Sequence, residues 1–323
     1  MLYPFIFNPI FQERVWGGRR LESLFGQNLP HNKLIGESWG VSDRTGAESQ
    51  IANGPLRGKT LRWLMETHAA ELLGDFPSRG GRFPWLAKIL DAQTDLSVQV
   101  HPPTCIADTM KGESKTEAWY IAHAEPTSQF IAGLKRGTTL ESLRTKIDRN
   151  ELSDCLHILQ AQASRSIFIP SGRVHSLGAG MVVFEIQENS DTTYRLYDWD
   201  RFGLDGKSRE LHVKQALQSI NFDDIEPSLC DSTRQNEQGY NHHLIAHAPE
   251  IFHLSHLHIE TKDSFALPGK GVRLLAITDR SITLETKGHF LKLKSGDFVL
   301  IPASSENPII QGKNAGFLLT QAS

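Results

Sequence analysis

From residue 84 onward the chain is a series of short runs rich in valine, isoleucine and aromatic residues, and this texture constrains the fold most strongly. The runs are bounded by Gly, Pro, Asp or Ser, and they read FPWLAKIL, LSVQV, AWYIA, QFIAGL, SIFIP and MVVFEIQ. Short strands separated by turn signals are typical of a β-sandwich or barrel. The sequence therefore predicts a mainly β protein, and strand-like runs resume at FHLSHLHI and continue to the end of the chain.

One stretch of this pattern occurs twice. The segment 164–177, SRSIFIPSGRVHSL, resembles the segment 295–309, SGDFVLIPASSENPI. Both read as strand, Ile-Pro, small-residue turn, strand, with Asn307 in the second copy where the first has His175. A β module used twice predicts two barrels, one active and one structural, although convergent turn chemistry explains so short a match equally well. The polar, weakly patterned residues 222–242 between them are predicted to be a linker or exposed loop.

We accordingly expect a catalytic domain over residues 1–221 and a C-terminal β domain without a metal site over residues 240–323. A small helical insertion is expected near residues 137–160, where TTLESLRTKI and DRNELSDCLHIL each begin with a candidate cap. Asp148, with Glu151 three residues later, resembles a capping box at the start of the second of these helices.

Two further segments have helical periodicity. In GKTLRWLMETHAAELLG the apolar residues recur at helical spacing, Thr60 is a candidate N-cap and Gly74 ends the pattern. His68 lies near the apolar stripe of this helix, so we expect it to be packed or half-exposed rather than functional. The run RELHVKQALQSI, residues 209–220, predicts a second helix.

Composition excludes several classes of protein. The chain has 323 residues, a length that suggests about two domains, and its formal net charge of −3 with scattered basic residues gives no support for nucleic-acid binding. No apolar run is long enough to span a bilayer, and the N-terminal segment lacks the features of a signal peptide. Cys105, Cys155 and Cys230 form no CxxC pair, so neither a disulfide framework nor a thiolate zinc site is expected. A reducing cytoplasm fits best.

A metal site is predicted from the run LSVQVHP and from two polar residues further along the chain. Gln99 and His101 are two residues apart, so in a strand their side chains share one face, roughly 7 Å apart at their roots. Glu117 opens the next expected strand with the same parity as Trp119, and a buried carboxylate without a partner is costly. A divalent cation would supply that partner, and His175 starts another strand after a Pro-Ser-Gly turn.

These four side chains offer two nitrogens and two oxygens, a set that suits Zn²⁺ or a harder first-row ion such as Mn²⁺ or Fe²⁺. The spacing alone is not specific, because the chain has 14 histidines. The run HLSHLHI also looks metal-binding, but its alternation fits the polar face of a strand as well, and we favour that interpretation.

A second group of candidate residues lies in FEIQENSDTTYRLYDWDR, residues 184–201. Charged runs of this kind are commonly solvated hairpins, but Glu185 sits inside an apolar run and shares a face with Val183 and Gln187. A carboxylate partly removed from water there would suit proton transfer. Arg195 is a permanent cation that could bind a phosphate or stabilise an oxyanion.

Together these blocks resemble a known family. The ordered segments KILDAQTDLSVQVHP, SKTEAWYI, IPSGRVHSL and FEIQENSDTTYRLYDWDR, followed by GKSRELH, are similar to the type I mannose-6-phosphate isomerases in their short bacterial form, and PIFQERVWGGRRL and IGESWGVSDR fit as well. The resemblance covers roughly residues 3–220, while the C-terminal hundred residues match only in texture. It implies two cupin-type (jelly-roll) β-barrels, a cytoplasmic enzyme of carbohydrate metabolism, and one Zn²⁺ per chain, with Mn²⁺ or Co²⁺ not excluded.

Carried onto this chain, the family's metal ligands fall on Gln99, His101, Glu117 and His175. Its catalytic arginine corresponds to Arg195, its catalytic carboxylate to Glu185, and a further cation of its pocket to Lys115. The implied reaction interconverts mannose 6-phosphate and fructose 6-phosphate through an enediol(ate). The implied partner is a small hexose phosphate, with no nucleic acid and no membrane; the oligomeric state stays open.

The chain departs from the family pattern at two places. Pro103 and Thr104 follow the QVHP motif where family members usually have an acidic residue, and Gly40 follows GESW where they commonly have Glu. Both changes are expected to alter the pocket wall and hence substrate preference. Trp16 could shape the pocket too, although a packed aromatic is the simpler interpretation.

Other interpretations of the same residues remain. Two histidines and a carboxylate also suit an Fe²⁺ cupin dioxygenase, against which stand Gln99 as a fourth ligand and the cations Lys115 and Arg195. A non-catalytic sugar-phosphate-binding cupin would keep the fold, but we would expect it to have lost Arg195 or a ligand. A purely structural β protein would leave the inward polar residues unexplained.

Overall fold

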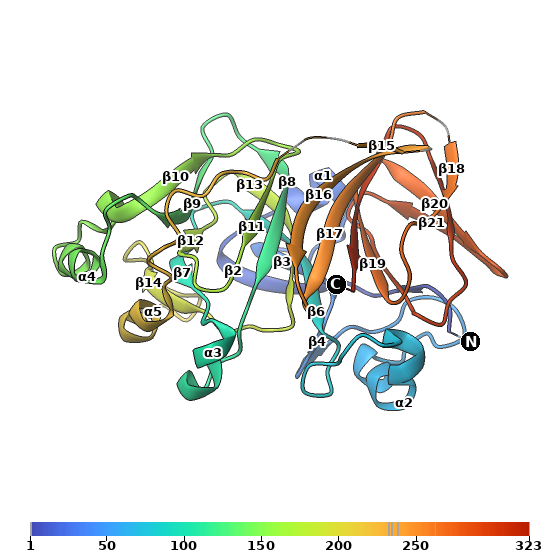
Figure 1. Ribbon diagram of the computed structural model, residues 1–323, viewed down its shortest axis with the longest axis horizontal. Coiled ribbons are helices and arrows are strands. Elements are labelled where there is room, and N and C mark those ends of the chain that lie inside the picture. Colours follow the sequence, from blue (N-terminus) through green and yellow to red (C-terminus); the bar gives the residue numbers. More distant parts are fainter. Residues whose placement is uncertain (1, 232, 234, 238, 262, 323) are drawn as a thin grey trace.

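The computed structural model describes residues 2–231, 233, 235–237, 239–261 and 263–322, and it consists of two β-barrels joined along one face (Figure 1). Each barrel is built from a large and a small antiparallel sheet. The predicted fold class, mainly β with two cupin-type barrels, is confirmed. Among the described residues, no helix combines the length and the apolar content needed to cross a membrane.

The first barrel holds the site residues. Its six-stranded sheet has the order β11 (Ser166–Ile169), β8 (Glu117–Ala124), β13 (Met181–Glu188), β6 (Trp85–Ala92), β3 (Ile35–Val41) and β2 (Ile10–Gly18). Its five-stranded sheet has the order β10 (Leu156–Gln160), β9 (Gln129–Leu134), β12 (His175–Ser176), β7 (Val98–Val100) and β14 (Tyr194–Tyr197). A small ribbon of β4 (Asp43–Arg44) and β5 (Ala47–Glu48) lies beside it.

The second barrel comes later in the chain. Its seven-stranded sheet has the order β1 (Phe5–Ile6), β22 (Phe298–Ile301), β19 (Arg273–Asp279), β24 (Ala315–Gln321), β17 (Phe252–Ile259), β16 (Tyr240–Ala248) and β15 (Gln235–Glu237). Its four-stranded sheet has the order β18 (Asp263–Ala266), β23 (Ile309–Gly312), β20 (Ser281–Thr286) and β21 (His289–Lys294).

The two barrels repeat one arrangement of strands. Taken in chain order, β15 to β24 occupy the same places in their sheets as β2, β3 and β6 to β13 do in theirs. The repeated sequence pattern falls on matching strands, because it covers β11 and β12 in the first barrel and β22 and β23 in the second. The module is therefore used twice, as the sequence predicted.

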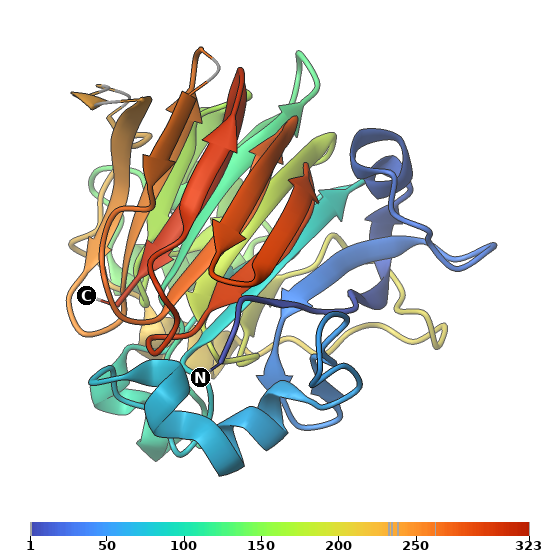
Figure 2. The ribbon, with the colours of Figure 1, turned by 90° about the vertical axis from the view of Figure 1, so that its right-hand side faces the viewer.

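The large sheets of the two barrels pack face to face, and Figure 2 shows their strands running side by side. One apolar cluster spans this seam, where the ring of Phe184 lies 5.9 Å from that of Phe298. The strand β6 is buried along its whole length because its sheet faces the barrel interior on one side and the second barrel on the other. Such a strand reads as a largely continuous apolar run. Lys88 has the parity of Leu90 and Ala92, which lie in the apolar cluster of the first barrel's interior.

The N-terminal strand β1 belongs to the second barrel. Phe5 pairs with Leu300 and Ile6 with Val299, so β1 extends the large sheet of the second barrel beyond β22. The N-terminus accordingly lies beside the second barrel in Figure 1. The expected domain division at residues 1–221 and 240–323 stays a prediction.

Helices are few and lie outside the barrels. They are α1 (Arg20–Phe25), α2 (Leu61–Leu73), α3 (Thr104–Ala107), α4 (Leu140–Asp148) and α5 (Val213–Ser219), with 3₁₀ turns η1 (Asp108–Met110) and η2 (Leu152–Cys155). The predicted start of α2 is confirmed, since the Thr60 side chain accepts from the Trp63 backbone N–H, and Gly74 follows its end. His68 is partly exposed and pairs with Glu71. The predicted helix near residues 209–220 is confirmed as the shorter α5.

The prediction for the helical insertion is partly wrong. The helix α4 forms as expected, but its capping box is made by Thr139 and Ser142. Asp148 is the last residue of α4, and Asn150 has a positive φ, so the helix does not continue past it. A capping box between Asp148 and Glu151 is therefore wrong, because Asp148 is itself helical. The rest of the expected second helix is the short turn η2 followed by the edge strand β10.

The predicted loop at residues 222–242 is also only partly right. Residues 222–231 and 233 carry neither helix nor strand, but β15 and the start of β16 lie within the segment. Residues 232, 234 and 238 lie outside the described residues. All three cysteines are free thiols, in agreement with the expectation from their spacing.

Candidate metal and catalytic site

Three predicted ligands meet inside the first barrel. The ligand atoms of His101, Glu117 and His175 all lie within 4.8 Å of one another, and each side chain is at most 1% exposed. His101 Nε2 lies 3.6 Å from Glu117 Oε2, and His175 Nε2 lies 3.4 Å from Glu117 Oε1. Among the described residues this is the only group of three His, Cys, Asp or Glu side chains so arranged.

Gln99 lies beside this group because strand pairing places it there. It is the direct cross-strand neighbour of His175, and its Nε2 lies 3.2 Å from His175 Nε2. Ser97 Oγ donates to Gln99 Oε1 at 3.1 Å. A half-turn of the Gln99 amide group exchanges its nitrogen and oxygen and would direct Oε1 toward the histidine nitrogens. Its place as a fourth ligand stays a prediction.

Hydrogen bonds on the outer side of each imidazole define its tautomer. His101 Nδ1 lies 2.8 Å from the carbonyl oxygen of Thr192, and His175 Nδ1 lies 2.9 Å from that of Arg173. A carbonyl only accepts, so both Nδ1 atoms carry the proton and both Nε2 lone pairs face Glu117. Burial lowers the pKa of both rings, that of His101 to about 3, so both are neutral and able to bind a cation.

Glu117 supplies the negative charge. Its two oxygens are buried; Oε2 is paired with the ammonium of Lys115, whereas Oε1 has no hydrogen-bond partner among the described residues. Burial alone would raise the pKa of this carboxyl, but the ammonium of Lys115, 2.5 Å from Oε2, holds it well below its usual range. Two neutral imidazole nitrogens and one ionised carboxylate are a donor set that fits a divalent ion such as Zn²⁺.

A row of alternating charges leads away from the ligands. Lys115 Nζ lies 3.4 Å from Glu185 Oε1, and Lys88 Nζ lies 3.0 Å from the same oxygen. Lys88 Nζ also lies 3.2 Å from Glu37 Oε2, and Arg14 Nε donates to Glu37 Oε1 at 2.7 Å. Burial alone would raise the pKa of Glu37, but Lys88 and Arg14 lower it to about 2.

Glu185 is linked to the predicted ligands through Lys115, whose ammonium contacts both Glu117 and Glu185. The Trp119 indole N–H donates to Glu185 Oε2 at 2.9 Å, which fixes the orientation of the carboxylate. The sequence predicted that Glu185 shares a face of its strand with Val183, and the packing confirms this. Val183 lies in the apolar cluster of the barrel interior, whereas Phe184, on the opposite face, lies in the seam cluster.

The row of charges lines one cavity of about 280 Å³, and His101, Glu117 and His175 lie behind its wall rather than on it. Gln99, Lys115, Glu185 and Arg195 face it together with six residues that sequence reasoning did not assign as site residues or left undecided: Arg14, Trp16, Glu37, Lys88, Asp191 and Arg209. The Arg195 Nε is buried without a hydrogen-bond partner among the described residues. Burial and the nearby Arg209 lower its pKa from the ordinary arginine value. Trp16 is both packed, at 4% exposed, and part of the cavity wall.

The most important residue missed from the sequence is Lys88. It lies inside WLAKIL, an otherwise apolar run buried along its whole length, and that position is the signal that could have identified it. A buried lysine needs an acidic partner, and Lys88 has two, Glu37 and Glu185.

Two further carboxylates of the run 184–201, Glu188 and Asp198, are structural. Glu188 accepts from the Thr116 backbone N–H and pairs with Arg79. Asp198 pairs with Arg201 and Arg209, which ties together the loop that follows β14. The solvated-hairpin interpretation is therefore inaccurate for these two carboxylates, because both are at most 4% exposed.

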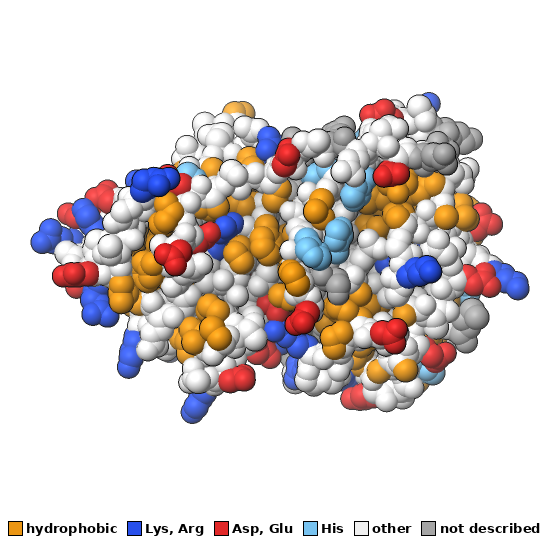
Figure 3. Space-filling view, viewed as in Figure 1, with side chains coloured by type: hydrophobic (Ala, Val, Ile, Leu, Met, Phe, Trp, Pro, Cys, Tyr) orange, Lys and Arg blue, Asp and Glu red, His pale blue; other side chains and the backbone are white. Residues whose placement is uncertain are grey.

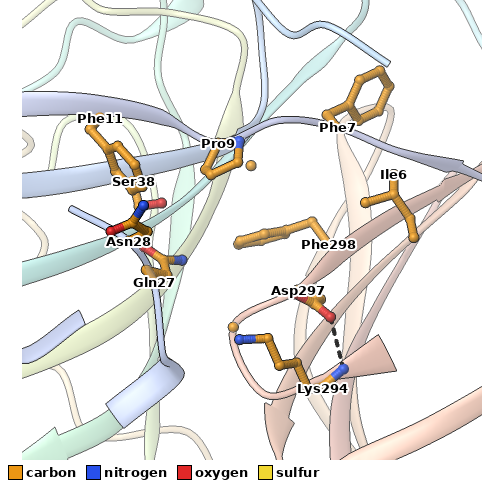
Figure 4. Close-up of a pocket in the computed structure, with 12 residues that line it drawn as sticks. Ile6, Phe7, Pro9, Phe11, Gln27, Asn28, Ser38, Lys294, Asp297 and Phe298 are labelled. Atoms are coloured by element: carbon orange, nitrogen blue, oxygen red, sulfur yellow. Dashed lines mark hydrogen bonds between the residues drawn. The ribbon is translucent and has the colours of Figure 1, made fainter. Parts of the chain in front are cut away.

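Neither departure from the family pattern lines the catalytic cavity. Gly40 borders a separate pocket of about 240 Å³ at the seam, together with Phe298 (Figure 4). A Cβ on Gly40 would lie 2.1 Å from a ring carbon of Phe298, so barrel packing explains the glycine. Thr104 lies on a third pocket, and Pro103 precedes α3.

The second barrel carries different residues at the ligand positions. Ile169 pairs with Glu117 in the first barrel, and its repeat counterpart Ile301 pairs with Arg273 in the second. Arg273 thus stands where Glu117 stands, and its Nη1 donates to Oδ1 of Asn307 at 2.5 Å. A guanidinium therefore occupies the position that corresponds to the carboxylate of Glu117, the predicted metal ligand.

Comparisons with known proteins agree with these observations. Residues 5–112 match the family model of the phosphomannose isomerase type I catalytic domain. The mannose-6-phosphate isomerase ManA of Bacillus subtilis is 43% identical over 219 residues, which cover 67% of this chain and 68% of that protein. The putative mannose-6-phosphate isomerase YvyI of the same organism is 32% identical over 96% of both chains. The crystal structure of a mannose 6-phosphate isomerase from Bacillus subtilis superposes with a TM-score of 0.91 at 30% identity, covering 99% of this chain and 100% of that one.

Proposed function

Because the chain belongs to the type I mannose-6-phosphate isomerase family, we propose that it interconverts mannose 6-phosphate and fructose 6-phosphate with the help of one divalent metal ion, Zn²⁺ first among the candidates. The observation that supports the metal dependence is the pair of neutral histidines whose Nε2 atoms face the ionised carboxylate of Glu117, whose Oε1 has no hydrogen-bond partner among the described residues. We assign Gln99, His101, Glu117 and His175 as its ligands.

The reaction moves a proton between C2 and C1 of the open-chain sugar, through an enediol(ate). A bound divalent ion would supply Lewis-acid polarisation of the sugar's carbonyl and hydroxyl oxygens. The chain must provide a base for the carbon-bound proton, a cation near the developing oxyanion and groups that hold the phosphate.

Glu185 is our candidate for the base. Its carboxylate faces the cavity and the side chain is 2% exposed. The Trp119 indole N–H donates a hydrogen bond to Oε2. The other oxygen lies near the ammonium groups of Lys88 and Lys115, which would limit the cost of holding a carboxylate in a buried site. Proton transfer by a positioned carboxylate typically contributes about 10²–10⁴-fold to the rate.

Arg195 is our candidate for contact with the substrate's negative charge. Its Nε has no hydrogen-bond partner among the described residues, and the guanidinium stands on the cavity wall. The other arginines there, Arg14 and Arg209, are paired with Glu37 and Asp198. A planar fork of donors matches either a phosphate or an enediolate oxygen, and Lys115 adds a second positive charge.

The cavity of about 280 Å³ lies just below the usual range for ligand pockets, about 300–1,000 Å³, in keeping with a small sugar phosphate. The free cysteines are compatible with the reducing cytoplasm that we expect as the compartment. We further propose that the second barrel has no site of this kind, since Arg273 and Asn307 take the ligand positions.

A coupled assay tests the proposal. Conversion of mannose 6-phosphate to fructose 6-phosphate should be lost after chelation, return with Zn²⁺ and be absent in His101→Ala. In D₂O the product should acquire deuterium at C1, and Glu185→Gln should stop both exchange and turnover while retaining the metal. A folded protein that binds the metal but does not convert mannose 6-phosphate would contradict the proposed substrate. Product formation that required Fe²⁺ and O₂ would favour the dioxygenase alternative instead.

A further inference from the structure

Histidine side chains gather on the surface over β16 and β17, at the centre of the face in Figure 3. His256 of this cluster has partners within the protein, since its Nε2 lies 3.1 Å from Thr278 Oγ1 and its ring stacks on that of Tyr120 at 4.7 Å. Among the described residues, only the group in the first barrel has the spacing of metal ligands. His256 therefore belongs to the packing between the barrels, whereas a residue without an assigned role touches the catalytic groups inside the first barrel.

That residue is Trp119, which contacts both the candidate base and a predicted metal ligand. It lies on β8 as the direct cross-strand partner of Glu185 on β13. Its indole N–H donates to Glu185 Oε2 at 2.9 Å, and its ring packs edge-on against that of His175, with centroids 5.6 Å apart and planes inclined at 78°. The side chain is 2% exposed and lines the catalytic cavity. One aromatic residue therefore connects the two parts of the site that the proposed reaction needs.

The indole is held in place by both sheets of the barrel. On its own sheet Trp119 pairs with Ile167 of β11 as well as with Glu185. From the other sheet Phe130 of β9 packs against it, with ring centroids 6.2 Å apart and planes inclined at 63°. A buried aromatic side chain confined in this way keeps its N–H in one direction. The donor to Glu185 is therefore oriented before a substrate binds.

The two oxygens of Glu185 have unequal partners. Lys88 Nζ and Lys115 Nζ lie 3.0 Å and 3.4 Å from Oε1, whereas Oε2 accepts from the neutral indole. The last torsion of a glutamate side chain is soft, so without a donor at Oε2 the carboxylate could rotate and place both oxygens against the ammonium groups. A base must present an oxygen within hydrogen-bond reach of the proton that it takes, so such a rotation would slow proton transfer.

The need to satisfy a buried indole does not by itself explain this contact. A buried N–H requires only an acceptor, and a main-chain carbonyl is sufficient, as for Trp85, which donates to one at 2.7 Å at the seam. Trp119 donates instead to a carboxylate of the catalytic cavity, and Trp39 does the same to Glu37 at 2.7 Å. Both carboxylates belong to the row of charges that lines the cavity.

We propose that Trp119 is a positioning residue for the isomerase reaction. Its N–H holds the Glu185 carboxylate in the orientation in which it takes the proton, and its ring supports the imidazole of His175. An indole donates one hydrogen bond and carries no charge, so it orients the carboxylate without forming an ion pair with it. This role rests on the proposed function, and it acts on the proton-transfer step rather than on the fold or on substrate affinity.

The test is the Trp119→Phe variant of the full chain, which keeps a buried ring and removes the N–H. With mannose 6-phosphate as substrate, we expect kcat to fall by about 100-fold, the size of effect typical of a catalytic group misplaced by about 1 Å. KM and the Zn²⁺ content should stay within about twofold of the wild type. Substrate deuterated at C2 should slow the variant at least as strongly as the wild type, because proton transfer is the affected step. An unchanged kcat, or loss of the isotope effect, would overturn the proposal.

Two further variants separate the contacts of the indole. Trp119→Leu removes the ring as well, so it should also lower Zn²⁺ affinity by about 10–100-fold, the range for loss of a partner of a metal ligand. Unchanged affinity would reject the support of His175. Trp85→Phe is the matched control, because it removes a buried indole hydrogen bond at the seam and should leave kcat unchanged. Equal losses of kcat in Trp85→Phe and Trp119→Phe would overturn the positioning role.

The wild type distinguishes this proposal from the proposed function. A wild-type protein that does not convert mannose 6-phosphate contradicts the proposed substrate and, with it, the role of Trp119. Conversion by the wild type together with an unchanged kcat in Trp119→Phe leaves the function standing and rejects the positioning role alone.

Discussion

His175 Nε2 lies 3.4 Å from Glu117 Oε1, and neither side chain is exposed to solvent. The two residues belong to different sheets of the first barrel, β12 and β8, so their contact bridges the barrel interior. A buried carboxylate needs cationic partners; the ammonium of Lys115 lies 2.5 Å from Glu117 Oε2, and Oε1 is left facing the imidazole of His175, where a divalent ion would complete its charge. Removing the charge of Glu117 should therefore remove the metal.

Replacing Glu117 by Gln removes the charge and keeps the shape. Loss of a residue that hydrogen-bonds to a metal ligand typically lowers metal affinity by about 10–100-fold. Because this substitution changes a predicted ligand itself, we expect the affinity for Zn²⁺ to fall by more than about 100-fold. Competition with a chromophoric chelator measures the affinity. Glu125→Gln is the control, since Glu125 lies just beyond the same strand and is half-exposed; equal affinities in the two variants would contradict the ligand assignment.

Chelated protein should lose stability on mild acidification. The pKa of His101 is about 3 in the fold, lowered by burial, whereas an unfolded histidine titrates near 6.5. Between these values the unfolded chain binds a proton that the folded chain does not, so the free energy of unfolding falls as the pH drops below 6.5. Urea unfolding at pH 7 and pH 5 should differ by about 2 kcal/mol for each such histidine. The His101→Asn variant should show a shallower dependence, and an identical slope would contradict the prediction.

Lys88→Met should both destabilise and inactivate the protein. The substitution leaves Glu37 and Glu185 buried without the ammonium that lies between them. Breaking one side of a buried ion pair costs about 3–5 kcal/mol, and urea unfolding measures it. Lys33→Met, which removes an exposed pair with Glu13, should change stability by less than about 1 kcal/mol. Comparable losses in both variants would show that Lys88 is not an internal counterion.

Gly40→Ala should weaken the seam without altering the catalytic cavity. The new methyl group would lie 2.1 Å from the Phe298 ring, and such overpacking typically costs about 1–3 kcal/mol. Activity per folded molecule should be unchanged, because Gly40 does not line the catalytic cavity. Adding Phe298→Leu should restore part of the lost stability, so a double-mutant cycle on thermal unfolding gives a coupling energy. Additive effects would show that the two residues do not compete for space.

The ligand geometry could be predicted from the sequence because it depends on strand parity. Gln99 and His101 are two residues apart, and Glu117 shares its face with Trp119. Alternate residues of any β-strand lie on one face, whatever the order of the strands in the sheet. The repeat around His175 and Asn307 likewise predicted two barrels, and the matching strand orders agree with it.

The partners of the ligands could not be predicted in the same way. Lys88, Glu37 and Arg14 come from three strands whose neighbours are set by sheet order, and no local pattern gives that order. The failed capping box has a similar cause. Asp148 and Glu151 have the right spacing, but whether a helix begins there depends on the backbone at Asn150, whose positive φ ends the helical course.

The pairing of β1 with β22 also bears on how the chain is made. At a synthesis rate of about 5–20 residues per second, Phe5 leaves the ribosome roughly 15–60 s before Leu300, its partner. During that interval the first barrel can fold, while β1 has no partner strand because β22 has not yet been synthesised. The second barrel is therefore completed only by a segment that was synthesised first, so a C-terminal fragment made alone would expose the edge of β22 and be prone to aggregate.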